Sequence, residues 1–152
     1  QVMFSAPYAS TSLAVFGPKS IPVKSASDLQ QTQVAATKGN TEEVALTEMN
    51  PQADIMRTEN DATTIAAYLS GQAQLFAASS FVPIELEKKN PGKEFDLKFV
   101  IRQSPGCMAV KIGEHNMLQW LNSFIYFYKM SGDLDKLHVK WLGRHMDPLP
   151  SI

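Results

Sequence analysis

The stretch Val34-Ala-Ala-Thr-Lys-Gly-Asn-Thr-Glu-Glu-Val44 decides the fold that we predict for this chain. Its first four residues form a short apolar run, which indicates a buried strand, and Lys38-Gly39-Asn40 indicates a tight turn. The segment 41–49 then predicts a helix, which Asn50-Pro51 ends. The stretch therefore reads as a strand that passes through a glycine turn directly into a helix.

Such a turn leaves backbone N–H groups directed at one point, where the helix dipole is also positive. Gly39 allows the chain to turn and lets a ligand approach the backbone. Thr41 adds a hydroxyl group, either as a ligand contact or as the cap of the helix. The pattern indicates a site for a carboxylate or a phosphate. An ordinary capped turn that binds nothing has the same local pattern, so the rest of the chain must decide between them.

Composition sets the broad class of protein. The 152 residues fit one domain, or one domain and part of another. With 44% hydrophobic and 19% charged residues, the chain can build an ordinary core. A net charge of -1 with interspersed signs argues against a nucleic-acid-binding surface, and no apolar run is long enough to span a membrane. The first residues lack the pattern of a signal peptide, so we expect no leader in this chain.

Strands and helices are predicted to alternate along the chain. We expect strands at 12–16, 34–37, 54–57, 74–78, 95–101 and 107–111, with a turn at Ser104-Pro-Gly106. We expect helices at 41–49, 61–69, 80–89, 114–130 and 133–142, with a short helical turn near 27–29. Strands separated by helices of about ten residues predict an α/β fold, a mostly parallel sheet flanked by helices.

In parallel sheets of this kind, ligands bind beyond the carboxyl ends of the strands, near helix starts. The Gly39-Asn40-Thr41 turn lies at that edge of the predicted sheet. Ala77-Ala78-Ser79-Ser80 lies there too, because it follows the fourth strand. The two strand ends are rich in hydroxyl and amide groups, and they predict a polar binding edge.

The order of short motifs resembles that of the periplasmic solute-binding proteins of polar amino-acid ABC transporters. No single motif decides the matter, but six follow one another in the expected order over nearly the whole chain. The segments are Phe4-Ser-Ala-Pro-Tyr8, Ser25-Ala-Ser-Asp-Leu29, 34–41, Ala67-Tyr-Leu-Ser-Gly-Gln-Ala-Gln-Leu75, Gly106-Cys-Met-Ala-Val110 and Leu134-Asp-Lys-Leu-His-Val-Lys-Trp-Leu142.

The resemblance implies one lobe of a two-lobed type II periplasmic-binding-protein clamshell, which closes on an amino acid by hinge bending. It implies a hinge segment at 1–11, the second α/β lobe at 12–101, a return hinge strand at 102–113, and a C-terminal helical segment with a tail at 114–152. The resemblance also implies that the first lobe, with the arginine that pairs with the ligand carboxylate, is largely absent from this chain.

The resemblance also implies which residues bind the ligand. Gly39, Asn40 and Thr41 match the turn that holds the ligand carboxylate. Ser79 stands where the family usually has an acidic residue for the ligand ammonium, and this departure removes a charge-assisted hydrogen bond. Tyr8, in the Phe4–Tyr8 motif, completes the predicted ligand-binding set.

Other chemistry finds little support in the sequence. His115, His138 and His145 are too far apart to predict a metal site, so we expect neither a metal nor a cofactor. No serine has the context of a nucleophile, and we expect no catalytic residues. Some relatives of this fold are dehydratases, and that activity would need a general acid at the site. The only acidic residues beside the turn are Glu42 and Glu43, so we consider a dehydratase the least favoured alternative.

The predicted helix at 114–130 is apolar on nearly every side, including Trp120, Phe124 and Phe127. Either it is a central core helix, or part of its surface meets another protein surface. We favour the second interpretation, with a homodimer formed through the C-terminal helices.

The resemblance therefore implies a non-catalytic periplasmic protein that binds a polar amino acid for an ABC permease. The isolated chain is expected to bind weakly or not at all, because few contacts would offset the entropy of association. The alternative is a stand-alone or engineered lobe that acts as a dimerising scaffold. We expect that the chain binds no nucleic acid and does not insert into a membrane.

Overall fold

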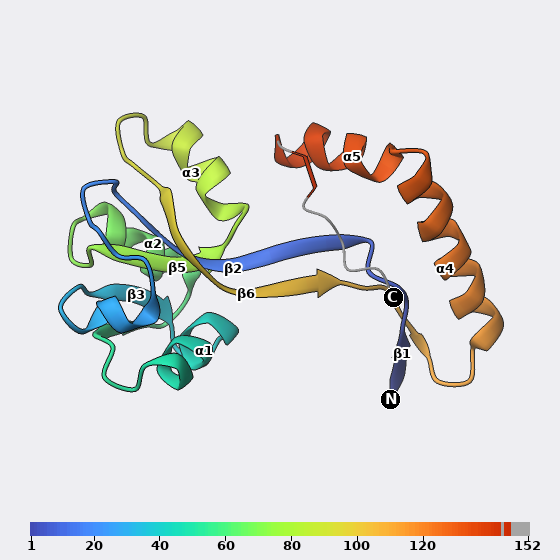
Figure 1. Cartoon of the computed structure of the whole chain (residues 1–152), viewed down its shortest axis with the longest axis horizontal. Helices are drawn as coiled ribbons and strands as arrows, with labels where there is room; N and C mark the ends of the chain where they lie inside the picture. The colour runs from blue at the N-terminus through green and yellow to red at the C-terminus, as the bar shows by residue number, and fades with distance from the viewer. Residues whose placement is uncertain (144, 147–152) are drawn as a thin grey trace. The chain divides into compact units, whose positions relative to one another are not determined.

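The computed structural model describes residues 1–143, 145 and 146, and most of the predicted tail at 144–152 lies outside these residues. The chain divides into two compact units, Ser12–Gln103 and Gln1–Thr11 with Ser104–Ile152. The chain passes between the units twice, inside the long strands β2 (Ala9–Gly17) and β6 (Asp96–Gly106) (Figure 1).

The larger unit is built on a five-stranded sheet in the order β4-β3-β5-β2-β6. Helical crossovers connect β3 (Val34–Thr37) through α1 (Thr41–Met49) to β4 (Ile55–Thr58), and β4 through α2 (Asp61–Leu69) to β5 (Leu75–Ser79). Because such crossovers join parallel neighbours, β3 pairs in parallel with both β4 and β5, as predicted.

The sheet is mixed, because β2 pairs with β5 in the antiparallel direction, with Leu13 opposite Ser79. No helical crossover leads from β2 to its neighbour in the sheet, since the short helix η1 (Ala26–Gln30) leads to β3 instead. The alternation of apolar residues that marks a strand carries no information on its direction.

Alternating side chains divide the core between the two faces of the sheet. Phe76 packs with Tyr68 and Phe95 on the face covered by α2 and α3 (Val82–Lys89), and its ring centroid lies 4.8 Å from that of Tyr68. Leu75 packs with Leu29 and Leu46 on the face covered by η1 and α1. Figure 1 shows α1 and α3 on opposite sides of the strands. Successive strand residues point to opposite faces, so one short strand supplies both core layers.

The smaller unit pairs β1 (Val2–Phe4) with β7 (Ala109–Lys111) in the antiparallel direction and adds the helices α4 (His115–Met130) and α5 (Asp133–Leu142). The Asn122 side chain of α4 accepts a hydrogen bond of 2.8 Å from the N–H of Ala6. This bond holds the segment that follows β1 against the middle of α4.

The predicted turn at 104–106 is wrong, because β6 continues through these residues. The carbonyl of Gly106 accepts a hydrogen bond of 2.9 Å from the N–H of Tyr8, and a Cβ at Gly106 would lie 3.4 Å from that of Ala9. This close pairing keeps the backbone extended. Pro105 has no N–H group, but it does not interrupt the hydrogen bond that the carbonyl of the next residue, Gly106, accepts from Tyr8.

The interpretation of α4 as a central core helix is also wrong for the described residues. Ile125 is the one buried residue of α4, and α5 has none. Trp120, Phe124 and Tyr128 stack along one side of α4, with ring centroids 5.4 and 4.3 Å apart. This stack shields part of each ring and leaves the outer surface of the helix apolar and exposed.

Candidate ligand-binding site

The start of α1 lies at the carboxyl edge of the parallel strands. Gly39 has a φ of 76°, a left-handed conformation that glycine adopts without strain. The Oδ1 atom of Asn40 accepts a hydrogen bond of 3.0 Å from the N–H of Glu43. Asn40 is therefore the helix cap, and the hydroxyl of Thr41, which the sequence left as cap or ligand contact, is not engaged in capping.

Glu43 holds the turn from inside the helix. One carboxylate oxygen accepts a hydrogen bond of 3.2 Å from the N–H of Gly39, and the other is 2.8 Å from Nε of Arg57 and 3.0 Å from the hydroxyl of Thr47. Burial favours the neutral form of Glu43, but the hydrogen bonds from Gly39, Thr47 and Arg57 outweigh burial and lower the pKa of its carboxyl.

Two N–H groups at the helix start remain available to a ligand. Among the described residues, the N–H groups of Thr41 and Glu42 have no acceptor, since they occupy the first turn of the helix. Thr41 lines an open groove of about 300 Å³, which we call the α1 groove. The other residues that line it are Gly39, Asn40, Val44, Ala45, Glu48 and Arg102.

Arg102 is the basic residue of this groove, and the sequence analysis did not predict it. It lies near the end of β6, far from the turn in sequence, and it makes no ion pair with any described residue. Its position beside the turn is a property of the assembled fold, which no local pattern contains. A guanidinium group here adds a positive charge beside the exposed N–H groups of the helix start.

Ser79 lies in a second hollow, of about 180 Å³, which we call the acidic pocket. Glu42 from α1 and Asp61 from α2 also line this pocket, together with Ala77 and Ala78 of β5. Asp61 accepts a hydrogen bond of 2.5 Å from the hydroxyl of Thr37. The full lining is Glu42, Asp61, Thr64, Ile65, Ala77, Ala78, Ser79, Phe81 and Val82.

The structure thus brings Gly39, Asn40 and Thr41 together at one groove and places Ser79 in a separate hollow, the acidic pocket. Tyr8 belongs to the other unit, where its N–H donates to Gly106. Its role in ligand binding stays a prediction.

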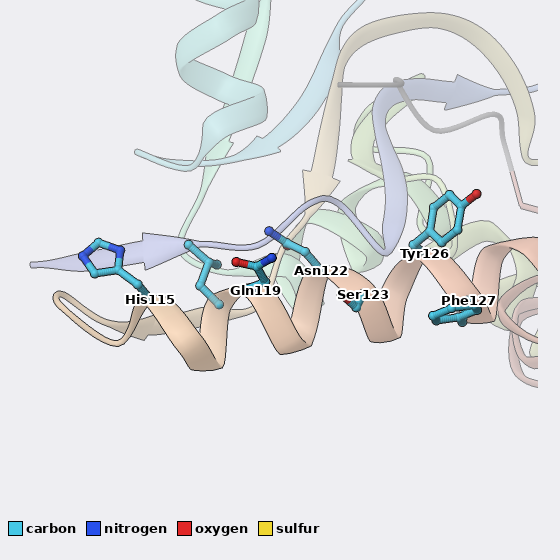
Figure 2. Close-up of a pocket in the computed structure, with 7 residues that line it drawn as sticks. His115, Gln119, Asn122, Ser123, Tyr126 and Phe127 are labelled. Carbon is cyan, nitrogen blue, oxygen red and sulfur yellow. The ribbon is translucent and has the colours of Figure 1, made fainter.

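The smaller unit has a groove of its own along α4, of about 520 Å³. Figure 2 shows the side chains of His115, Gln119 and Asn122 following one another along the helix, with Tyr126 further on. Nothing in the sequence analysis assigned a ligand to this groove. In the part of the chain that the structure describes, no group of three metal-ligating side chains comes together.

A partly parallel sheet with a capped helix start and a polar pocket at its carboxyl edge defines the chain as a lobe with the type II periplasmic-binding-protein fold. Comparison with known proteins confirms the resemblance predicted from the motifs. The chain is 25% identical over 143 residues to the ABC transporter glutamine-binding protein GlnH of Bacillus subtilis (strain 168). The match covers 93% of this chain and 52% of that protein, so the chain spans about half the length of this relative.

Solved structures show the same fold. An ancestral cationic amino acid solute-binding protein is 28% identical, with a TM-score of 0.77 and coverage of 93% of this chain and 62% of that one. The unliganded, open L-cystine solute receptor of Neisseria gonorrhoeae has a TM-score of 0.79 at 15% identity, with coverage of 97% and 62%. No protein-family model matches the chain. Among the described helices, none has the length and apolar character needed to cross a membrane.

Proposed function

We propose that this chain forms an amino-acid-binding lobe of an extracytoplasmic solute-binding protein that serves an ABC permease. The observation that carries the proposal is the start of α1, where Thr41, with its N–H and hydroxyl groups, and Arg102 line one open groove. The names of the relatives support it, since they describe proteins that bind glutamine and cationic amino acids.

In this proposal the ligand carboxylate binds at the helix start. The N–H groups of Thr41 and Glu42 and the Thr41 hydroxyl donate hydrogen bonds, and the helix dipole and Arg102 favour the negative charge. The Asn40 cap and the bonds of Glu43 fix the turn before the ligand arrives, so little conformational entropy is lost on binding. Closure about a hinge formed by 1–11 and 102–113 would then exclude water.

The donors at this groove are few, so we expect a dissociation constant weaker than about 1 μM. The test is a titration of the isotopically labelled chain, followed by NMR, with L-glutamine and with its analogue in which an amide replaces the α-carboxylate. L-Glutamine should shift the amide signals of Gly39, Asn40 and Thr41, and the amide analogue should not. Equal shifts with both compounds would contradict carboxylate capture.

A variant pair makes the titration sharper. Thr41→Val removes the hydroxyl without changing the shape of the side chain, and it should weaken L-glutamine binding about three- to tenfold, the value of one hydrogen bond. Thr32→Val makes the same change at a residue that lines neither the α1 groove nor the acidic pocket, and it should leave binding unchanged.

A second candidate function is that of a dimerising unit, and the exposed apolar surface of α4 and α5 favours it. Phe127 is 68% exposed and Trp141 is 73% exposed, which is unusual for large aromatic side chains. The two functions are compatible, since this surface and the α1 groove belong to different units.

A dehydratase activity has less support. The pKa of Glu43 is lowered and its carboxylate is paired with Arg57, so Glu43 is ionised at neutral pH and has no proton to donate. The names of the two relatives of 25% identity or more that are described above are those of binding proteins.

A further inference from the structure

The sheet of the smaller unit consists of β1 and β7, and among the described strands neither has a neighbour on its outer edge. A two-stranded sheet is marginally stable in water, and a free edge presents unpaired N–H and C=O groups to other chains. Charged side chains or proline usually protect such an edge. β7 carries the exposed Lys111, whereas β1 contains neither a charge nor a proline. β1 is therefore the unprotected edge of this unit.

The pairing of β1 with β7 decides which of its backbone groups face outward. The N–H of Ser5 donates a hydrogen bond of 2.8 Å to the carbonyl of Met108. Bonded and non-bonded positions alternate along an antiparallel pair, so Met3 is bonded to β7, and the backbone groups of Val2 and Phe4 face outward. The side chains of Val2 and Phe4 are also exposed, while that of Met3 is partly buried.

A second copy of the chain offers a strand that matches this edge. Across a two-fold axis at Met3, the two β1 strands run antiparallel, and Val2 lies opposite the partner's Phe4. This register pairs all three residues of each strand, and the outward N–H and C=O groups of Val2 meet those of the partner's Phe4. Because β1 is uncharged, no like charges meet, and four exposed apolar side chains come together on one face.

The same pairing brings the helices of two copies together. The N–H of Ala6, just after β1, donates to the side chain of Asn122, so α4 lies beside this sheet. Figure 2 shows Asn122 directed at this segment, which is drawn in pale blue. A two-fold axis perpendicular to the sheet keeps both α4 helices on the same side. The centres of the two halves lie two strand spacings apart, about 10 Å, and packed helices lie about 8–10 Å apart.

The apolar surface of the smaller unit is large enough for a stable dimer. Six of its aromatic side chains are 39–73% exposed, namely Phe4, Trp120, Tyr126, Phe127, Tyr128 and Trp141. At about 150–250 Å² for a whole aromatic side chain, the six together expose roughly 700 Å². A stable interface takes about 800 Å² from each partner, and exposed aliphatic side chains such as Val2 and Met130 supply the rest.

We infer that β1 is the central strand of a homodimer, in which the two-stranded sheets of two copies join into one four-stranded sheet in the order β7-β1-β1-β7. This inference rests on the dimerising unit, our second candidate function, and assigns its two-fold axis to Met3. It does not depend on amino-acid binding, because β1 and the α1 groove belong to different units.

A disulfide cross-link tests this register directly. Met3 lies opposite the partner's Met3 at a non-bonded position, where Cα atoms are about 4.5 Å apart, within the range of a disulfide. Met3→Cys in a Cys107→Ser background should form an intermolecular disulfide under mild oxidation. Val110→Cys in the same background places the thiol on β7, three strand spacings or about 14 Å from its counterpart, and should not cross-link.

A charge at the edge tests the contact without a cross-link. Phe4→Lys should weaken the dimer tenfold or more in light scattering, because it places a charge in the centre of the apolar contact. Ala109→Lys adds the same charge opposite Phe4 on β7, away from the partner strand, and should change the dimer less than about twofold. Both positions are exposed, so both variants should melt at the temperature of the wild type when diluted to monomers.

Hydrogen exchange followed by NMR adds a readout from the backbone. The amides of Val2 and Phe4 should be protected at high protein concentration and should exchange rapidly on dilution, whereas the amide of Met3, bonded within the chain, should change less. Amides of Val2 and Phe4 that exchange rapidly at every concentration would contradict the pairing.

The outcomes separate this inference from the function on which it rests. If the mass is doubled but Met3→Cys forms no disulfide and Phe4→Lys leaves the dimer intact, pairing through β1 is wrong and a contact through the helices alone stands. Equal cross-linking of Met3→Cys and Val110→Cys would indicate random collision and would also overturn the pairing. If the chain is a monomer at every concentration, both the pairing and the dimerising unit are overturned.

Discussion

Glu43 is the residue on which the shape of the α1 start depends most directly. Its carboxylate joins the N–H of Gly39 to the guanidinium of Arg57, which comes from β4. The turn is therefore tied to the sheet by a side chain as well as by the backbone. The sequence marked Glu43 only as a favourable charge for the helix dipole, because its partner on β4 follows from parallel strand pairing, not from local spacing.

We predict that the stability contributed by Glu43 depends on pH. The pKa of Glu43 is lower in the folded chain than in the unfolded chain, so the unfolded chain binds the proton more readily. Stability therefore falls as the pH falls through the ordinary pKa of 4.5 and then through the pKa of the folded chain. Glu43→Gln should cost about 1–3 kcal/mol at neutral pH, where a charge-assisted network is lost. The difference from the wild type should shrink in acid.

Urea unfolding of both proteins between neutral pH and pH values below 4.5 measures this difference. Glu48→Gln, one turn further along the same helix, carries the same charge change at an exposed position and serves as the control. A difference between Glu43→Gln and the wild type that stays constant with pH would show that the carboxylate charge does not hold the turn.

Helix and strand boundaries were predicted best where the residues that set them are adjacent in sequence. The strand at 34–37 and the helices at 41–49 and 133–142 have the predicted bounds, because a cap, a glycine or an Asn-Pro pair marks their ends. β6 was predicted to end too early, because the Pro-Gly signal at 105–106 is overridden by pairing with Tyr8 and Ala9. The antiparallel direction of β2 is likewise a property of the assembled sheet.

The two asparagine caps allow a test of which helix start has a function. Asn40 caps α1 through the N–H of Glu43, and Asn60 caps α2 through the N–H of Thr63, each at 3.0 Å. Asn40→Ala and Asn60→Ala should each cost about 1 kcal/mol of stability. Only Asn40→Ala should also weaken L-glutamine binding, because the α1 groove is lined by Asn40.

The measurement combines thermal unfolding with the NMR titration, and Asn40→Ser and Asn60→Ser should restore stability because serine also caps helices. An equal loss of binding in both alanine variants would assign the effect to general destabilisation and not to the start of α1.

At the scale of the whole molecule, the sequence predicted the α/β class of fold and, from its motifs, the resemblance to solute-binding proteins. The comparisons bear both predictions out. It did not predict Arg102 or the meeting of Glu42 with Asp61, because these depend on which strands and helices become neighbours. It did indicate that α4 carries more apolar surface than one small unit can bury. The structure agrees, since most of that surface is exposed on α4 and α5.

We predict that this exposed surface forms a homodimer. Trp120 is 59% exposed and Met130 is 70% exposed, in addition to Phe127 and Trp141, so a two-fold contact between helix pairs would remove many large side chains from water. Light scattering after size exclusion should give twice the monomer mass. Phe127→Gln and Trp141→Gln should each weaken the dimer by a factor of ten or more, roughly the loss of 2 kcal/mol expected at the centre of an interface.

Because these side chains are exposed in the single chain, the substitutions should leave its unfolding free energy within about 0.5 kcal/mol of the wild type. Leu97→Gln, at an exposed apolar position of β6 in the larger unit, removes a similar side chain away from the helices and should not change the mass. A monomer at every concentration, with tryptophan emission characteristic of full exposure to water, would contradict the dimer. The α4 and α5 surface would then need a different occupant, and the amino acid titrations would remain valid because their site lies wholly within the larger unit.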